Sequence, residues 1–339
     1  MGDRAFILPG AEIVMNRWMG LLPAVLLLGS GQAGPARPRA WRPFSPDSPW
    51  NQKIPRNPET DPRSQELVED LAKSCRWDFL GINIKGYSIP VYYIDAPRTP
   101  TVLVKCRTTG EGFDKPVPIP DVAAPDPQSD HHLCIVDRKL GLEWGMWDAR
   151  RNADGSWTCG LGAMADLKGT GVRPLAGRAP RWQLAAGARA SGFPLIAGLI
   201  TVEEVKAGAI EHALALAYPH CRSRYFIPPA STAQGTTAEA RPDRGIPMGG
   251  RLQLDPAIDV SRLPLSPSGR IVARALQEYG AYVCDYSGAI NLYADGSPDA
   301  QKEWANKLLD TYEIQRVFKP DMLRRFRVLK MPEFLDNRN

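Results

Sequence analysis

The stretch that most constrains the fold is DHHLCIVDRKLGLEWGMWDARR, residues 130–151, which has the pattern of a β-hairpin. Residues 131–137 are rich in Leu, Ile and Val, as strands are. Residues 138–141 supply a turn, and residues 142–148 alternate again. The pattern therefore predicts two paired antiparallel strands.

This hairpin carries side chains of the types that act in catalysis and ligand binding. Because successive side chains of a strand point to opposite faces, His132 lies on the face opposite to His131, and Glu143 shares a face with Trp147. A histidine, a carboxylate and an aromatic on paired strands can line a groove in which a sugar is held and attacked. The alternative is an ordinary core hairpin with polar residues at its ends.

Short strand-like runs dominate the rest of the chain, and no helix stands between two strands in the way that a parallel sheet requires. The fold class predicted is mainly β, an antiparallel, jelly-roll-like β-sandwich with a few covering α-helices. Residues 169–190, rich in Gly, Ala and Arg, are predicted to form a surface loop, and residues 281–293 a second hairpin. The predicted helices span residues 65–73, 266–279 and 299–310, and the other predicted strands residues 88–94, 101–105, 156–165, 209–218, 248–254 and 326–330.

The N-terminus has the features of an export signal. A positive start, the apolar run 19–28 and small residues after it predict a signal peptide over residues 1–36, with Met15 as an alternative start. The run is too short for a membrane span. A proline-rich arm, residues 37–63, is expected to pack on one β-rich domain, residues 64–339. The predicted location is extracellular or periplasmic, with no membrane partner after the signal is removed.

Composition limits the classes of binding partner that the chain is expected to have. The net charge of +5 allows an acidic polymer and demands none, and no basic run typical of nucleic-acid binding is present, so no nucleic acid is expected. An even number of cysteines in an exported chain favours disulfides, although the pairing stays open. The six cysteines are Cys75, Cys106, Cys134, Cys159, Cys221 and Cys284.

Several motifs are absent from the sequence: the GxSxG elbow, HExxH and the phosphate-binding P-loop. No metal site and no cofactor are predicted, with a structural calcium ion left open because two acidic turns loosely resemble calcium loops. A metal-dependent hydrolase built on His131 and His132 is kept as a minor alternative. The protein is expected to be a monomer.

The strings FSPDSPWN, SDHHLCIVD, GFPLIAGL with EEVKAGAIEHAL, PMGGRLQL and ALQEYGAYVCD resemble a family of secreted bacterial proteins of uncharacterised function. The similarity runs from about residue 43 to the C-terminus. The pattern includes the double histidine and the positions of Glu143, His212, Arg251 and Asp285. The resemblance implies a sugar-rich extracellular setting. It does not indicate which reaction, if any, the protein catalyses.

Two functions are consistent with these residues. The first is a secreted enzyme that cleaves glycosidic bonds in a polysaccharide. Hydrolysis needs two carboxylates, for which Glu143 is paired with Asp166, Glu203 or Asp285. Elimination at a uronic acid instead needs a base, His132 or His212. The four predicted catalytic residues are therefore Glu143, His132, His212 and Asp166.

The second function is carbohydrate binding without catalysis, by a binding module or cell-surface protein in which tryptophans stack on sugar rings. Both functions use the same predicted contacts. Arg251 would bind a substrate carboxylate through paired hydrogen bonds. If the hairpin is a working site, His132, Glu143, His212 and Arg251 are expected to meet in one cleft. The predicted substrate-binding residues are Arg251, Trp147, Trp144, His131 and Asp285.

Overall fold

The computed structural model describes residues 39–74, 77–173, 187–233 and 244–337. Residues 38–339 group into one compact unit. The predicted signal peptide, residues 1–36, lies outside the described residues. Within the described part of the chain, no helix is long and apolar enough to cross a membrane.

Strands outnumber helices in this unit. The strands are β1 (Leu80–Asn83), β2 (Val91–Tyr93), β3 (Thr101–Val102), β4 (Val104–Thr109), β5 (Val117–Pro118), β6 (Leu133–Asp137), β7 (Leu142–Trp147), β8 (Arg150–Arg151), β9 (Trp157–Asp166), β10 (Leu214–Tyr218), β11 (Arg222–Phe226), β12 (Pro247–Met248), β13 (Arg251–Leu254), β14 (Ala281–Tyr286), β15 (Ile290–Tyr293), β16 (Phe326–Val328) and β17 (Leu335–Asp336). The helices are α1 (Ser64–Lys73), α2 (Val202–Ala207), α3 (Pro267–Glu278), α4 (Pro298–Ala305), α5 (Thr311–Val317) and α6 (Pro320–Leu323), with short 3-10 turns η1 (Pro49–Asn51), η2 (Ala96–Arg98) and η4 (Val260–Arg262).

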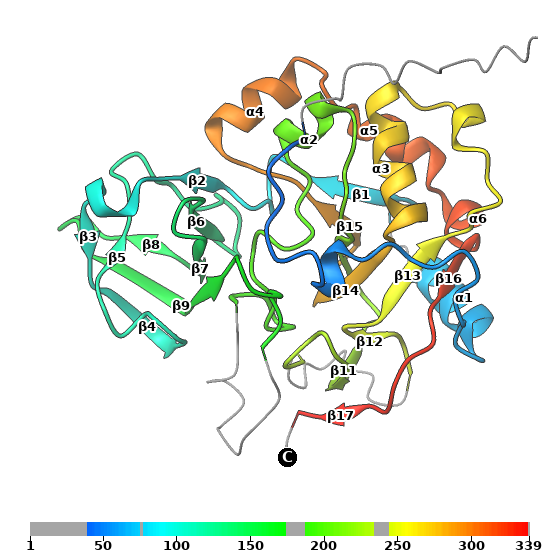
Figure 1. Cartoon of the computed structure of the whole chain (residues 1–339), viewed down its shortest axis with the longest axis horizontal. Helices are drawn as coiled ribbons and strands as arrows, with labels where there is room; N and C mark the ends of the chain where they lie inside the picture. Colours follow the sequence, from blue (N-terminus) through cyan, green and yellow to red (C-terminus); the bar gives the residue numbers. More distant parts are fainter. Residues whose placement is uncertain (1–38, 75–76, 174–186, 234–243, 338–339) are drawn as a thin grey trace, which may run out of the picture. The chain divides into compact units, whose positions relative to one another are not determined.

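The main sheet has the strand order β1-β15-β10-β14-β13-β16 (Figure 1). Two of its pairs, β1 with β15 and β10 with β14, are parallel, and the others are antiparallel. β10, Leu-Ala-Leu-Ala-Tyr, is wholly buried, as expected for a central strand with both faces covered. It lies between β14 and β15, so the predicted hairpin over residues 281–293 is wrong, although both of its strands exist.

The second large sheet has the order β2-β6-β7-β9-β4, with β8 beside β9. β6 and β7 form the predicted antiparallel hairpin, in which Ile135 faces Trp144 and Val136 faces Glu143. β2 with β6 and β4 with β9 are parallel pairs. Two smaller sheets complete the fold of the described residues. One pairs β3 with β5, and the other has the order β12-β11-β17.

Two hydrophobic clusters are buried, and β6 contributes to both. Cys134 and Val136 belong to the large cluster around the main sheet, whereas Leu133 and Ile135 belong to a smaller one under the second sheet. Since neighbouring residues of a strand face opposite ways, both faces of β6 are covered. This explains why β6 reads as a continuous apolar run and not as an apolar–polar alternation.

Helix α3 shows why the sequence forms its helices here. The Ser266 hydroxyl caps it by accepting from the Gly269 N–H, and Pro267 occupies its first turn. Its apolar residues, Ile271 and Leu276 among them, are buried, and the helix packs against β13. Gly280 follows with φ +70°, where a Cβ would lie 2.1 Å from the Leu252 carbonyl oxygen, so only glycine fits.

The proline-rich arm lies partly in the main core. Trp50 is buried with its ring edge-on to Phe193 and Tyr282, at centroid distances of 4.8 and 5.1 Å. The Asn51 side-chain amide donates to the carbonyls of Pro43 and Ser45. The aromatic residues of the arm therefore hold it against the sheet by burial of their rings.

The mainly β prediction is confirmed, with few helices and several sheets. The finer prediction of a jelly-roll-like antiparallel sandwich is not confirmed, because both six-stranded sheets contain parallel pairs. Parallel neighbours need crossover connections, which short strand runs read in isolation do not reveal.

Candidate functional site

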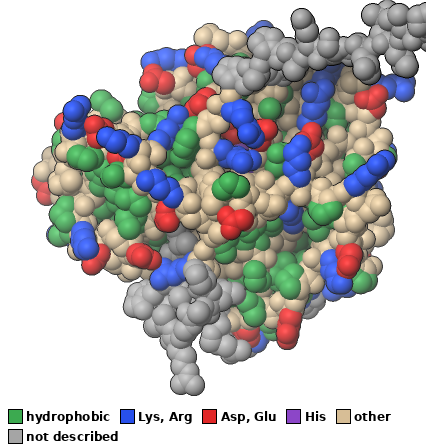
Figure 2. All heavy atoms as spheres, viewed as in Figure 1, with side chains coloured by type: hydrophobic (Ala, Val, Ile, Leu, Met, Phe, Trp, Pro, Cys, Tyr) green, Lys and Arg blue, Asp and Glu red, His purple; other side chains and the backbone are tan. Residues whose placement is uncertain are grey.

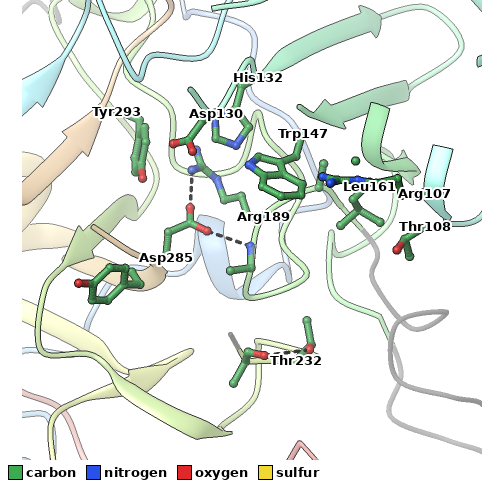
Figure 3. Close-up of a pocket in the computed structure, with 15 residues that line it drawn as sticks. Arg107, Thr108, Asp130, His132, Trp147, Leu161, Arg189, Thr232, Asp285 and Tyr293 are labelled. Atoms are coloured by element: carbon green, nitrogen blue, oxygen red, sulfur yellow. Dashed lines mark hydrogen bonds and ion pairs between the residues drawn. The ribbon is translucent and has the colours of Figure 1, made fainter. Parts of the chain in front are cut away.

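The structure contains a pocket of about 610 Å³ between strands of the two large sheets (Figure 3). One wall comes from β4, β7, β9 and the segment that precedes β6. The opposite wall comes from the ends of β14 and β15 and from residues 188–190. The lining residues are Arg107, Thr108, Asp130, His132, Trp147, Gly160, Leu161, Ala188, Arg189, Ala190, Thr232, Ala233, Asp285, Tyr286 and Tyr293.

A buried ion pair lies in this pocket. Arg189 Nη1 donates to Asp285 Oδ2 at 2.9 Å, and the Arg189 side chain is wholly buried. Arg189 Nη2 also donates to the Leu195 carbonyl, and its guanidinium lies 4.2 Å from the centre of the Tyr293 ring. Asp285 Oδ1 accepts from the Ala190 N–H. Both ions are thus held by several partners, as buried charges must be.

A bulge in β14 positions Asp285. Leu216 of β10 pairs with Val283, but the next residue, Ala217, pairs with Asp285, so Cys284 is an extra residue in the strand. Such bulges change the direction in which the following side chain points, and they are frequent next to functional sites. Here the bulge directs the Asp285 carboxylate toward Arg189 and the pocket (Figure 3).

Asp130 is the second pocket carboxyl group. It lies just before β6 and lines the pocket together with Trp147. Burial, followed by the negative charge of Asp285, raises the pKa of Asp130 above its ordinary value. The pocket therefore holds two carboxyl groups in different surroundings. Asp285 is paired with the Arg189 guanidinium, whereas Asp130 keeps its proton to a higher pH than an ordinary aspartate.

His132 supplies a neutral imidazole to the same wall. It is buried, and its Nδ1 has no hydrogen-bond partner within the described residues. Burial and the nearby charge of Arg189 lower the pKa of His132 to about 3. A buried nitrogen without a partner is costly, so His132 Nδ1 reduces the stability of the fold.

Trp147 and Arg107 form the rim of the pocket. The Arg107 guanidinium lies 5.3 Å from the centre of the Trp147 ring and is paired with Asp148 at 3.0 Å. Gly160 lies beneath both, because a Cβ there would come within 2.5 Å of the indole and 2.7 Å of Arg107. Trp147 is 37% exposed, which leaves indole surface available to a ligand.

Three of the nine predicted site residues line this pocket: His132, Trp147 and Asp285. Glu143, His212 and Arg251 do not line it, so the structure does not bring the four predicted cleft residues together. Each of these three side chains instead forms hydrogen bonds with protein groups outside the pocket. Their roles remain predictions without support from the pocket.

Glu143 fixes a loop instead of facing the pocket. It is fully buried, and its two oxygens accept the N–H groups of Leu195 and Ile196 at 2.7 and 3.0 Å. Burial raises the pKa of Glu143 to about 7 despite these hydrogen bonds. The bonds hold the segment that follows Arg189 against β7, so Glu143 positions the pocket wall indirectly.

Glu143→Gln is expected to destabilise the protein. The amide nitrogen of glutamine cannot accept a hydrogen bond, so one of the two backbone N–H groups would lose its partner, at a cost of about 1–3 kcal/mol. Urea unfolding of the variant and of the wild type measures this loss. Equal midpoints and slopes for the two proteins would contradict it.

His212 lies in a buried pair at the start of the main sheet. Its Nε2 lies 2.8 Å from Glu204 Oε1, and its Nδ1 lies 2.8 Å from the Ala213 carbonyl oxygen. Glu204 also completes a capping box with Thr201 at the start of α2. Burial alone would lower the pKa of His212, but the charge and hydrogen bond of Glu204 raise it above its ordinary value, against a smaller opposing effect of Arg42.

The free energy of unfolding is expected to fall at alkaline pH. A histidine whose pKa is raised on folding contributes stability that is complete below its unfolded pKa of about 6.5 and lost as the pH rises through its folded pKa. Unfolding measured from about pH 6 to pH 9 tests this. The decline should be shallower in His212→Gln, and a wild-type slope in that variant would refute the assignment.

The remaining predicted residues have structural partners. Arg251 donates to the carbonyls of Tyr279 and Gln52, and its guanidinium lies 5.0 Å from the Tyr282 ring centre. Trp144 is buried in the smaller hydrophobic cluster. His131 has φ +41°, and its Nδ1 lies 2.9 Å from the Asp126 carbonyl oxygen. Asp166 is exposed and accepts from the Lys168 N–H in a turn.

Sequence reasoning missed Arg189, Asp130, Arg107 and Tyr293. Arg189 falls in residues 169–190, which were predicted to form a surface loop. In the part of this segment that the structure describes, Ala188 and Arg189 are buried, and residues 174–186 lie outside it. Only Asp130 had a usable signal, because it directly precedes the double histidine.

Among the described residues, no group of three or more His, Cys, Asp or Glu side chains is arranged to hold a metal ion. Comparison with known proteins returned no matching family model, no similar curated protein and no similar solved structure.

Proposed function

We propose that the protein is a secreted carbohydrate-active enzyme that cleaves glycosidic bonds in an extracellular polysaccharide, with its active site in the pocket of Asp130 and Asp285. The supporting observation is that two carboxyl groups with different electrostatic surroundings line one pocket. Pairs of this kind divide the roles of acid and base between them.

The roles follow from the surroundings. Glycoside hydrolysis needs a protonated acid for the leaving oxygen and a second carboxylate that activates water or attacks the sugar. Asp130, whose pKa is raised by burial and by Asp285, suits the acid. Asp285, fixed by Arg189 and the Ala190 N–H, suits the carboxylate.

His132 favours hydrolysis over elimination. A lyase needs a base able to take a proton near neutral pH. Because burial and Arg189 lower the pKa of His132 to about 3, its imidazole is a weak base. His132 is therefore not the catalytic base in this proposal.

Trp147 gives the pocket a sugar-binding surface. Exposed indole rings stack on the apolar faces of sugars, and this ring lies at the rim beside Arg107. On the face of the molecule shown in Figure 2, basic and acidic side chains are interspersed. Because no single charge dominates this face, we expect the pocket to select the polymer there.

A second function, a non-catalytic carbohydrate-binding protein, is favoured by one observation. Both oxygens of Asp285 already accept hydrogen bonds, from Arg189 and from Ala190. A carboxylate so engaged can serve to hold the pocket together. In that case Trp147 would bind sugar and no bond would be cleaved.

A product screen separates these functions. The exported protein is purified and incubated with neutral and acidic polysaccharides, and both reducing ends and the ultraviolet absorbance of unsaturated sugars are followed. New reducing ends without that absorbance are expected. Binding to a polysaccharide without cleavage of any would support the second function, and neither binding nor cleavage would reject both.

A further inference from the structure

Cys106 and Cys159 lie side by side on neighbouring strands. They are direct register partners in the parallel pair β4–β9, and their sulfur atoms are 2.7 Å apart. Neighbouring strands lie about 4.8 Å apart, within the Cα separations that disulfides span. The structure holds both as free thiols.

The surroundings of Cys106 distinguish it from the other described cysteines. Its partner Cys159 is buried, and the hydrogen bond that it donates to Cys106, together with burial, raises the pKa of its thiol, so Cys106 reacts first. Cys134, Cys221 and Cys284 are buried, and burial raises the pKa of each thiol, which makes it unreactive. Cys106 is only half-buried, and the hydrogen bond from Cys159 lowers the pKa of its thiol. Cys106 can therefore be reached, and it forms a thiolate more readily than the buried cysteines.

We propose that Cys106 and Cys159 form a reversible disulfide by exchange with a low-molecular-weight disulfide of the glutathione type. The Cys106 thiolate attacks one sulfur of that molecule, forms a mixed disulfide and releases one thiol. The Cys159 thiolate then attacks the Cys106 sulfur and releases the second thiol. The two protein thiols lose two electrons, the small disulfide gains them, and the two protons pass to the released thiols.

The bond would tie together the strands that carry one wall of the pocket. Arg107 follows Cys106 in β4, and Gly160 follows Cys159 in β9, and both line the pocket. Neither Cys106 nor Cys159 lines the pocket, so the disulfide would form outside it and leave it open. The bond needs only the two thiols and does not depend on the proposed carbohydrate chemistry.

Thiol counting on the full chain tests the proposal. The reduced protein is incubated with oxidised glutathione, unfolded in a thiol-blocking buffer and analysed by mass. A loss of two of the six cysteine thiols is expected, with a peptide that carries Cys106 joined to one that carries Cys159. Dithiothreitol should restore all six.

Matched variants locate the bond. Cys106→Ser should keep its five thiols, apart from a mixed disulfide at Cys159, whereas the control Cys221→Ser should still lose two. The peptide map of the wild type needs no variant, so a folding defect in either variant leaves the test intact. Six free thiols at saturating oxidant, or a bridge that joins any other pair, would overturn the proposal.

Discussion

Asp130→Asn should reduce turnover of a cleaved polysaccharide by about two to four orders of magnitude, the usual contribution of a general acid. Asparagine has nearly the size and shape of aspartic acid and keeps a carbonyl oxygen, so the variant loses the proton donor with little change in the shape of the pocket. The wild type should also lose activity as rising pH removes the Asp130 proton. Steady-state kinetics across pH would show that alkaline limb and its absence in the variant.

The matched control is Asp321→Asn. Asp321 is fully exposed, is paired with Arg324 at 3.0 Å and does not line the pocket. Its turnover and melting temperature should match those of the wild type. If Asp130→Asn keeps full activity on a substrate that the wild type cleaves, Asp130 is not the acid.

Arg189→Met should destabilise the protein by about 3–5 kcal/mol, because removing one partner of a buried ion pair leaves the other uncompensated. The variant would strand the Asp285 carboxylate and the Leu195 carbonyl, which both accept from Arg189. A fall in Tm of about 10 °C is expected. Calorimetry or urea unfolding measures it.

Two comparisons sharpen this test. Glu66→Gln breaks an exposed pair with Arg63, which is worth about 0–1 kcal/mol, and should barely change Tm. The double variant Arg189→Met, Asp285→Leu removes both charges, so it should recover part of the loss. A single Arg189→Met variant as stable as the wild type would show that the pair does not stabilise the fold.

Elements defined by neighbouring residues could be predicted from the sequence. The hairpin of β6 and β7, the helix α3 with its Ser266 cap and the Thr201–Glu204 capping box all follow from local patterns. Apolar spacing and cap residues act over a few positions, so one sequence suffices to find them.

Features that depend on distant partners could not be predicted. Arginine is rarely buried without a pair, and the partner of Arg189 lies 96 residues away, so its segment resembled a surface loop. The bulge at Cys284 is a property of two strands in register and leaves no mark on β14 alone. The insertion of β10 between β14 and β15 was hidden for the same reason.

The pairing of β1 with β15 has a consequence for folding. Leu80 of β1 and Ile290 of β15 are register partners, although they lie far apart in the sequence. The main sheet is therefore complete only after β15 has paired with β1. Such long-range contacts slow folding, since the intervening chain must be ordered first. β15 also carries Tyr293, so a nascent chain that has not yet reached residue 290 has an unpaired β1 edge and an incomplete pocket.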